Sequence, residues 1–295
     1  MPHRSYHGLI KGLVALAAIA SLGVSLAAVS WADVGTAQPP RPQRIVSLNL
    51  CADQYLLALA DPGQIAGLTH NAADPAMSAA AASAKRAHIM GQSAEEILAI
   101  DPDLIVGIPA RRSGIMAALA GHNYPVVDLK PAKSYDDIVA QIRQVAAAIG
   151  QVARGETLIA GMNAELASLP RASGKPVAAY YQRRGFMTGT GTLVDEMMTR
   201  VGLINLAVKL DKPVLAQLSL EEMLAAHPDY LIVESATDRI TDQGTEMLHH
   251  PILDGIARLH IPQAWTVCGG PAYVRAARSL SQQIARAEAV RISAR

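Results

Sequence analysis

The stretch "SAEEILAIDPDLIVG", Ser93 to Gly107, occurs a second time in the chain as "SLEEMLAAHPDYLIV", Ser219 to Val233. Laid on each other without a gap, the two copies share the serine, both glutamates, a leucine, an alanine, the proline and the aspartate. In each copy the serine can cap a helix whose first turn holds the glutamates, and the proline separates this helix from an apolar, strand-like run. The repeat therefore predicts the same helix and strand in two lobes that arose by duplication.

The segments around the two copies alternate between strand-like and helical patterns. Strands are expected at residues 44–50, 64–69, 103–107, 125–129, 175–181, 229–233 and 264–270. Such alternation is typical of parallel sheets covered by helices. Only the span from Ser134 to Leu169 is helical throughout. The sequence thus predicts an α/β fold with two lobes of mainly parallel sheet, residues 43–150 and 170–295, joined by a connecting helix at 151–169.

The first 32 residues have the order of a secretory signal peptide. Basic residues precede "LVALAAIASLGVSLAAV", an uncharged apolar run, and small residues follow it. An uncleaved membrane anchor is the alternative, but the Pro-rich leader "TAQPPRPQR" comes next and no later stretch is apolar enough to span a bilayer. We expect cleavage after Ser30 or Ala32, a mature chain beginning near Asp33, and export to the periplasm.

Composition excludes some classes of function. The 295 residues are 51% hydrophobic and 17% charged, with a net charge of +1. Lysine and arginine are scattered, so the chain lacks the basic patch of a nucleic-acid-binding protein. The length suits two domains of ordinary size, each with its own core.

The order of motifs adds a family resemblance. "RIVSLN", "SAEEILAIDPDLIVG", a helical span, "GTGTLVDEMMTRVGLINLA", "SLEEMLAAHPDYLIV" and a final helix after "TVCGG" resemble the periplasmic binding proteins for iron chelates and cobalamin that serve ABC importers. The likeness covers residues 43–289. It implies two α/β lobes on a rigid connecting helix, little hinge motion, and a metal chelate bound in a cleft between the lobes. We expect a monomer without a cofactor or a metal site of its own, which delivers the chelate to the transmembrane subunits of a permease.

An exported α/β hydrolytic enzyme is the rival class. "GTGTL" from Gly189 lacks the lysine of a phosphate-binding loop and the spacing of a dinucleotide fingerprint, so we expect a turn there with Thr192 near a helix N-cap. His249 and His250 are adjacent and would point apart on a helix, unlike a metal-binding pair. No nucleophile elbow is present either. The sequence therefore favours a binding protein over an enzyme.

Topology selects the residues that face the ligand. In open α/β sheets ligands lie outside the carboxyl ends of the strands, so the loops after the strands are the candidates. Two such loops, one in each lobe, carry adjacent arginines: Arg111 with Arg112, and Arg183 with Arg184. Solvated surface charge is the alternative interpretation. The other predicted ligand contacts in these loops are Asn49, Cys51, His70, Tyr181 and Cys268.

The residues available for the cleft also predict the class of ligand. The chain has one phenylalanine, and Trp265 is the only tryptophan after the predicted signal peptide. A cationic cleft with few aromatic residues favours an anionic ferric siderophore, because arginine donates paired hydrogen bonds to carboxylates. Haem comes second, with propionates for the arginines and a tyrosine for the iron. Cobalamin comes third.

Cys51 and Cys268 are the only cysteines and fall in loops on opposite sides of the predicted cleft. In an exported protein a disulfide across the cleft is one possibility. Two separate thiols that touch the ligand, and two buried small residues without a role, are the others.

The repeated glutamates have two interpretations. They can serve as caps and solubilising charges. The resemblance implies a second use, because binding proteins of this family present one acidic residue per lobe to arginines of the permease. Glu95 and Glu221 match these docking positions most closely, and Glu96 and Glu222 are the fallback pair.

Overall fold

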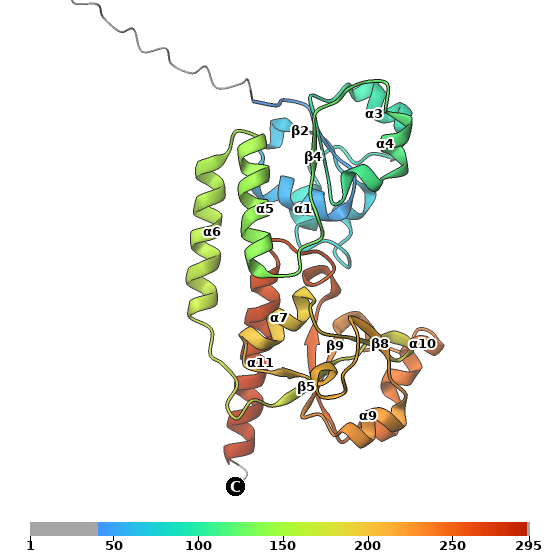
Figure 1. Ribbon diagram of the computed structural model, residues 1–295, viewed down its shortest axis with the longest axis vertical. Coiled ribbons are helices and arrows are strands. Elements are labelled where there is room, and N and C mark those ends of the chain that lie inside the picture. The colour runs from blue at the N-terminus through green and yellow to red at the C-terminus, as the bar shows by residue number, and fades with distance from the viewer. Residues whose placement is uncertain (1–40, 92, 294–295) are drawn as a thin grey trace, which may run out of the picture. The chain divides into compact units, whose positions relative to one another are not determined.

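The computed structural model describes residues 41–91 and 93–293, which fall within one compact unit, Pro40–Arg295. Two four-stranded parallel sheets form two α/β lobes, which confirms the predicted fold class. Figure 1 shows the N-terminal lobe in blue to green and the C-terminal lobe in yellow to red. The predicted signal peptide lies outside the described residues. Within those residues, no helix combines the length and hydropathy needed to cross a membrane.

The N-terminal lobe has the sheet order β2-β1-β3-β4. Its strands are β1 (Ile45–Ser47), β2 (Ile65–Gly67), β3 (Leu104–Gly107) and β4 (Val126–Asp128). Its helices are α1 (Leu50–Leu59), α2 (Ala81–Ala84), α3 (Ala94–Ile100) and α4 (Gly114–Ala118). The two inner strands, β1 and β3, are buried along their whole length, as their continuous apolar sequences predict.

The C-terminal lobe has the sheet order β10-β9-β5-β7 and an added two-stranded antiparallel sheet of β6 and β8. Its strands are β5 (Val177–Tyr180), β6 (Phe186–Thr188), β7 (Ile204–Asn205), β8 (Leu215–Gln217), β9 (Tyr230–Glu234) and β10 (Ala257–Ile261). Its helices are α7 (Leu193–Arg200), α8 (Leu206–Lys209), α9 (Leu220–Ala226), α10 (Gln243–Glu246) and α11 (Tyr273–Ser293). Short 3₁₀ turns connect many of these elements.

The last strand was predicted at the wrong place. Residues 264–270 form turns, and the strand is β10, "ARLHI". β10 is an edge strand in which the polar residues Arg258 and His260 alternate with the buried Leu259 and Ile261. The other strands were predicted from the continuous apolar runs that are typical of buried parallel strands. The alternating sequence of β10 does not have this pattern.

The repeated phrase has the same structure in both lobes. Ser93 and Ser219 are the N-caps of α3 and α9, and each hydroxyl accepts the backbone N–H three residues later at 3.1 Å. Both helices end on a residue in the left-handed region, Asp101 (φ 49°) and His227 (φ 44°). The strands that follow, β3 and β9, are inner strands of their sheets. The two copies therefore agree in the N-cap of the helix, in the end of the helix and in the inner position of the strand that follows.

Two long helices connect the lobes. α5 (Tyr135–Ala148) and α6 (Val152–Ala167) pack side by side in Figure 1, and α6 also contacts α11. Close packing requires Gly155 of α6, because a Cβ there would lie 2.7 Å from the Cβ of Ala146. The largest apolar cluster contains Tyr55 of the N-terminal lobe, Ile142 of α5 and Tyr180 of the C-terminal lobe. The two lobes therefore share one core.

A buried carboxylate ties α1 to the loop after β2. Asp53 is fully buried and accepts hydrogen bonds from the backbone N–H of Thr69 at 3.1 Å and from its hydroxyl at 2.5 Å. Burial raises the pKa of Asp53 to about 6, although hydrogen bonds from Thr69 and Ser47 oppose this shift. The folded protein therefore holds the Asp53 proton more tightly than the unfolded chain does, and the carboxylate predominates only above about pH 6.

This shift predicts a pH dependence of stability. Because the pKa of Asp53 rises from 3.8 to about 6 on folding, its contribution to stability is fully present below pH 3.8 and is lost as pH rises through about 6. Relative to Asp53→Asn, the wild type should lose on the order of 2 kcal/mol of unfolding free energy between pH 4 and pH 7. Urea unfolding of both proteins across this range measures the difference. A difference that does not change with pH would show that the Asp53 carboxyl titrates normally.

Candidate ligand-binding site

Segments at the carboxyl ends of the two sheets are fastened to each other. Cys51, in the first turn of α1 rather than in a loop, and Cys268, in the loop after β10, form a disulfide with a Cα–Cα distance of 5.3 Å. Beside it the Tyr55 hydroxyl lies 2.9 Å from the Gly269 carbonyl oxygen and 3.0 Å from Oε1 of Gln141. Of the three arrangements considered for the cysteines, the structure has the disulfide between the lobes. The strand ends that topology selects for ligand binding are therefore held opposite each other.

Three neighbouring strands of the C-terminal lobe end in polar residues. Gln182, Glu234 and Gln263 lie at the carboxyl ends of β5, β9 and β10, and all three line two cavities of about 320 and 210 Å3. We call the polar residues that line the smaller cavity the C-lobe floor. Its members are Tyr180, Gln182, Thr188, Glu234, Gln263 and Thr266.

Hydrogen bonds connect the C-lobe floor. The Gln182 amide donates to Oε1 of Glu234 at 3.2 Å, and the Tyr180 hydroxyl lies 3.1 Å from the Thr266 hydroxyl. Burial raises the pKa of Tyr180 far above its usual value, so this hydroxyl stays protonated. The floor thus offers amides and hydroxyls together with a single carboxylate.

Apolar side chains border the C-lobe floor. Phe186 of β6 and Leu215 of β8 line the larger cavity and are 37% and 56% exposed. Val267 lines the smaller cavity and is 39% exposed. Clustered exposed apolar side chains beside convergent polar groups are typical of small-molecule sites. We call Phe186, Leu215 and Val267 the apolar rim.

The predicted arginines are exposed, but two of them have carboxylate partners in their own lobe. Arg111 forms an ion pair with Asp128 at 3.4 Å. Arg183, which lines the larger of the two cavities, forms one with Asp242. Arg112 and Arg184 have no ion pair with any described residue. Contact of the four arginines with a ligand stays a prediction. Because two of them are paired with carboxylates, the four together offer less positive charge than four free guanidinium groups would.

The prediction for Tyr181 is wrong. Its side chain is fully buried, and its hydroxyl donates to the Leu218 carbonyl oxygen at 2.8 Å. Successive side chains of a strand point to opposite faces, so Tyr180 reaches the C-lobe floor while Tyr181 joins the second apolar cluster of this lobe.

The predicted N-lobe residues lie at strand ends. Asn49 caps α1: its Oδ1 accepts the Ala52 N–H at 3.1 Å, and its Nδ2 donates to the Ile108 carbonyl oxygen at 3.1 Å. It therefore holds the loops after β1 and β3 together. His70 is exposed in the turn after β2. Ligand contacts of both residues stay predictions.

The structure adds residues that the sequence did not single out. Gln182, Phe186 and Glu234 lie in or beside the loops selected by topology, where the adjacent arginines predicted an anion site instead. Gln263 was missed because the last strand was misplaced. Within residues 41–91 and 93–293, no group of three or more His, Cys, Asp or Glu side chains could hold a metal ion.

The paired glutamates of the repeat differ in their contacts. Glu96 accepts the Gly91 N–H at 2.6 Å, and Glu222 lies 3.2 Å from Lys212. Glu95 and Glu221 are exposed and have no ion pair with a described residue. Backbone N–H groups at the helix starts, assisted by the capping serines, lower the pKa of Glu95 and Glu221. The first glutamate of each copy is therefore ionised and presented to solvent.

Comparison with known proteins identifies the family. The model of a family described as periplasmic binding protein matches residues 45–257. The chain belongs to this family. The match includes both copies of the repeat and most of the C-lobe floor, and it confirms the predicted resemblance to binding proteins for iron chelates and cobalamin.

Relatives of this binding protein extend over most of its length. The vitamin B12-binding protein of Pectobacterium carotovorum subsp. carotovorum is 28% identical over 266 residues, which are 84% of this chain and 91% of the relative. That of Pectobacterium atrosepticum is 28% identical over 209 residues, 66% of this chain and 72% of the relative. The apo periplasmic heme-binding protein RhuT from Roseiflexus sp. RS-1 is 27% identical with a TM-score of 0.66, covering 82% of this chain and 97% of that protein. All three relatives are named as binding proteins.

Proposed function

We propose that this protein is the substrate-binding component of an ABC importer and that it captures a corrinoid such as cobalamin in the periplasm. The observation that carries the proposal is the combination of the C-lobe floor with the apolar rim. A corrin ring has an apolar face and a periphery of neutral amides. Phe186 and Leu215 offer apolar contact for the ring, and the amides and hydroxyls of the floor offer partners for its amides.

Charge in the site favours a neutral chelate over an anionic one. Glu234 lines both cavities and would repel a propionate or a catecholate, whereas the charge of Arg183, which lines the larger cavity, is offset by Asp242. Arg111 and Arg183, which the sequence offered as anion contacts, are paired with Asp128 and Asp242. The corrinoid therefore replaces the ferric siderophore as the first choice of ligand.

Haem is the second candidate. Arg112 and Arg184 are exposed without carboxylate partners among the described residues, and guanidinium groups suit propionates. The relatives include a vitamin B12-binding protein and a heme-binding protein. Both ligands are preformed chelates, so each agrees with a binding role without catalysis.

Variants of the rim and the floor test the corrinoid proposal. Phe186→Ala should weaken cyanocobalamin binding by about 1–2 kcal/mol, because apolar contact with the ring is lost. Glu234→Gln should leave cyanocobalamin affinity nearly unchanged but strengthen binding of haemin, since a like charge is removed. Calorimetric titration measures both effects, with Val208→Ala, an exposed apolar residue outside the site, as the control. If Phe186→Ala and Val208→Ala bind cyanocobalamin alike, the rim does not contact the ligand.

A further inference from the structure

A buried amide holds the turn beside the smaller of the two cavities. Asn205, the last residue of β7, is 2% exposed, and its Nδ2 atom donates to the Thr188 carbonyl oxygen at 3.3 Å and to Oδ1 of Asp195 at 3.0 Å. Its Oδ1 atom accepts the Ala207 N–H at 3.1 Å. Both amide hydrogens and the carbonyl oxygen are therefore used, as expected for a buried polar side chain. Asn205 thus links β7 to both flanks of the turn between β6 and α7.

This turn, residues 189–192, is tightly built. Gly191 has a φ of 72°, and its N–H donates to Oδ2 of Asp195 at 3.0 Å. Gly189 lies against the segment before β8, where a Cβ added to the glycine would lie 1.8 Å from the Pro213 carbonyl oxygen. Because the turn is fixed on both sides, its flanking residues keep one position as long as the Asn205 contacts hold.

Both flanks of the turn reach the proposed ligand site. Thr188 and Val194 line the smaller cavity. The Thr188 hydroxyl lies 3.4 Å from Oε1 of Gln182, whose amide donates to Glu234. Asn205 itself lines neither cavity. It therefore acts on the site only through Thr188 and the helix that carries Val194.

The N-terminal lobe has an equivalent link. β1 lies between β2 and β3 in its sheet, as β5 lies between β7 and β9 in the other. Asp53, near the start of the helix after β1, accepts hydrogen bonds from Thr69, which follows β2. Asp195, near the start of α7, accepts one from Asn205 in the same way. In both lobes a helix carboxylate thus ties down the end of a neighbouring strand, at the edge of the sheet where ligands lie.

We infer that Asn205 is a positioning residue of the ligand site, which holds Thr188 and Val194 in the wall of the smaller cavity. The inference rests on the proposed function, since this cavity belongs to the site proposed for the corrinoid. The Nδ2 atom of Asn205 lies between two hydrogen-bond acceptors, the Thr188 carbonyl oxygen and the Asp195 carboxylate. Without this donor both acceptors lose a buried partner, so the turn moves and the wall loses the shape that the ligand requires.

Exchange of the amide and the carboxylate tests the inference. Asn205→Asp keeps the size of the side chain and the oxygen that accepts the Ala207 N–H, but it places a second acceptor beside Asp195. It should weaken cyanocobalamin binding about tenfold or more in calorimetric titration, on the scale of a lost hydrogen bond to a charged group. Adding Asp195→Asn supplies the missing donor from the opposite side of the contact, and this double variant should recover most of the affinity.

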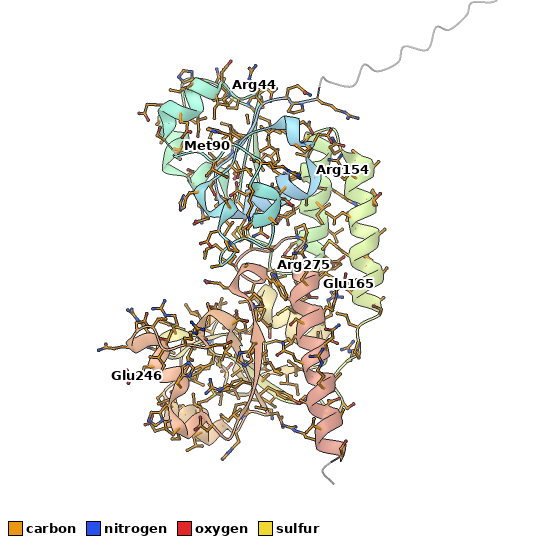
Figure 2. The ribbon with its side chains drawn as sticks, turned by 180° about the vertical axis from the view of Figure 1, so that it is seen from behind. Arg44, Met90, Arg154, Glu165, Glu246 and Arg275 are labelled. Carbon is orange, nitrogen blue, oxygen red and sulfur yellow. A yellow bond between two sulfur atoms is a disulfide. The ribbon has the colours of Figure 1, made fainter. Side chains whose placement is uncertain are left out.

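A matched variant in the N-terminal lobe controls for lost stability. Gln151 is 9% exposed, its Nε2 atom donates to Oδ2 of Asp61 at 2.7 Å, and it lines neither cavity. Figure 2 labels Arg154, the ion-pair partner of Asp61, at the end of α6 beside the N-terminal lobe. Gln151→Glu repeats the change from an amide to a carboxylate that faces an aspartate. It should lower the Tm, as Asn205→Asp does, and leave cyanocobalamin affinity unchanged.

The affinities of these variants decide the inference. Equal cyanocobalamin affinity in the wild type and Asn205→Asp, an equal loss in Asn205→Asp and Gln151→Glu, or no recovery in the double variant would overturn it. A wild type that binds no cyanocobalamin contradicts the corrinoid proposal instead, and hydrogen exchange of the ligand-free protein then tests the positioning role. We expect faster exchange within residues 186–195 in Asn205→Asp and wild-type exchange in the double variant. Exchange that is unchanged in Asn205→Asp would overturn the inference.

Discussion

Replacing Cys51 and Cys268 together by alanine is expected to lower the free energy of unfolding by about 2–5 kcal/mol. The disulfide joins residues 217 positions apart, so it restricts most of the unfolded chain. It also fastens the first turn of α1 to the loop after β10, beside the hydrogen bond between the Tyr55 hydroxyl and the Gly269 carbonyl oxygen. Equilibrium unfolding in guanidinium chloride measures the change.

Reduction provides the control for this prediction. Dithiothreitol should destabilise the wild type by a similar amount and leave the double alanine variant unchanged. An unfolding midpoint that is the same in the oxidised wild type and in the variant would mean that the bridge adds nothing to stability. Ligand affinity measured on the same two proteins then shows whether the bridge also fixes the distance between the strand ends.

Replacing Glu95 and Glu221 together by alanine is expected to reduce transport strongly while ligand binding stays intact. Both side chains are exposed on corresponding helices of the two lobes. A permease with two like subunits would require the same charged group twice, and rim ion pairs act mainly on association rate and orientation. Uptake by cells that carry the cognate permease, and association with that permease in lipid discs, measure the effect.

A matched charge change elsewhere controls for the loss of two carboxylates. Asp136 lies in the first turn of α5 and is exposed, as is Asp254, and neither lies on α3 or α9. The double variant Asp136→Ala with Asp254→Ala should transport normally. Its association with the permease should still weaken as salt is raised, whereas that of Glu95→Ala with Glu221→Ala should depend less on salt. Normal uptake by Glu95→Ala with Glu221→Ala would leave helix capping as the reason for the repeated glutamates.

Much of the fold was predictable because its signals are local. The serine caps at Ser93 and Ser219 and the apolar runs of β3 and β9 lie within short stretches of sequence, and both copies have the predicted structure. The Thr192 cap of α7 was predicted on the same grounds. β10 was missed because polar and buried apolar residues alternate along it, unlike the continuous apolar runs of β3 and β9.

The site was less predictable because it depends on contacts between distant residues. Topology placed the loops correctly at the strand ends, yet nothing local shows that Asp128 pairs with Arg111 or that Asp242 pairs with Arg183. The orientation of Tyr180 and Tyr181 depends on where β5 lies in its sheet. These pairings and Glu234 in the C-lobe floor support our proposal of a neutral ligand in place of the anionic one that the sequence predicts.

The most direct test is a competition for one binding site. Purified protein is incubated with equal amounts of cyanocobalamin, haemin and a ferric catecholate siderophore, freed of unbound ligand by gel filtration, and examined by visible spectroscopy. We predict the spectrum of cyanocobalamin with one corrinoid per chain. A haem Soret band or a ferric catecholate band in place of the corrinoid spectrum, or no retained ligand at all, would contradict the proposed function.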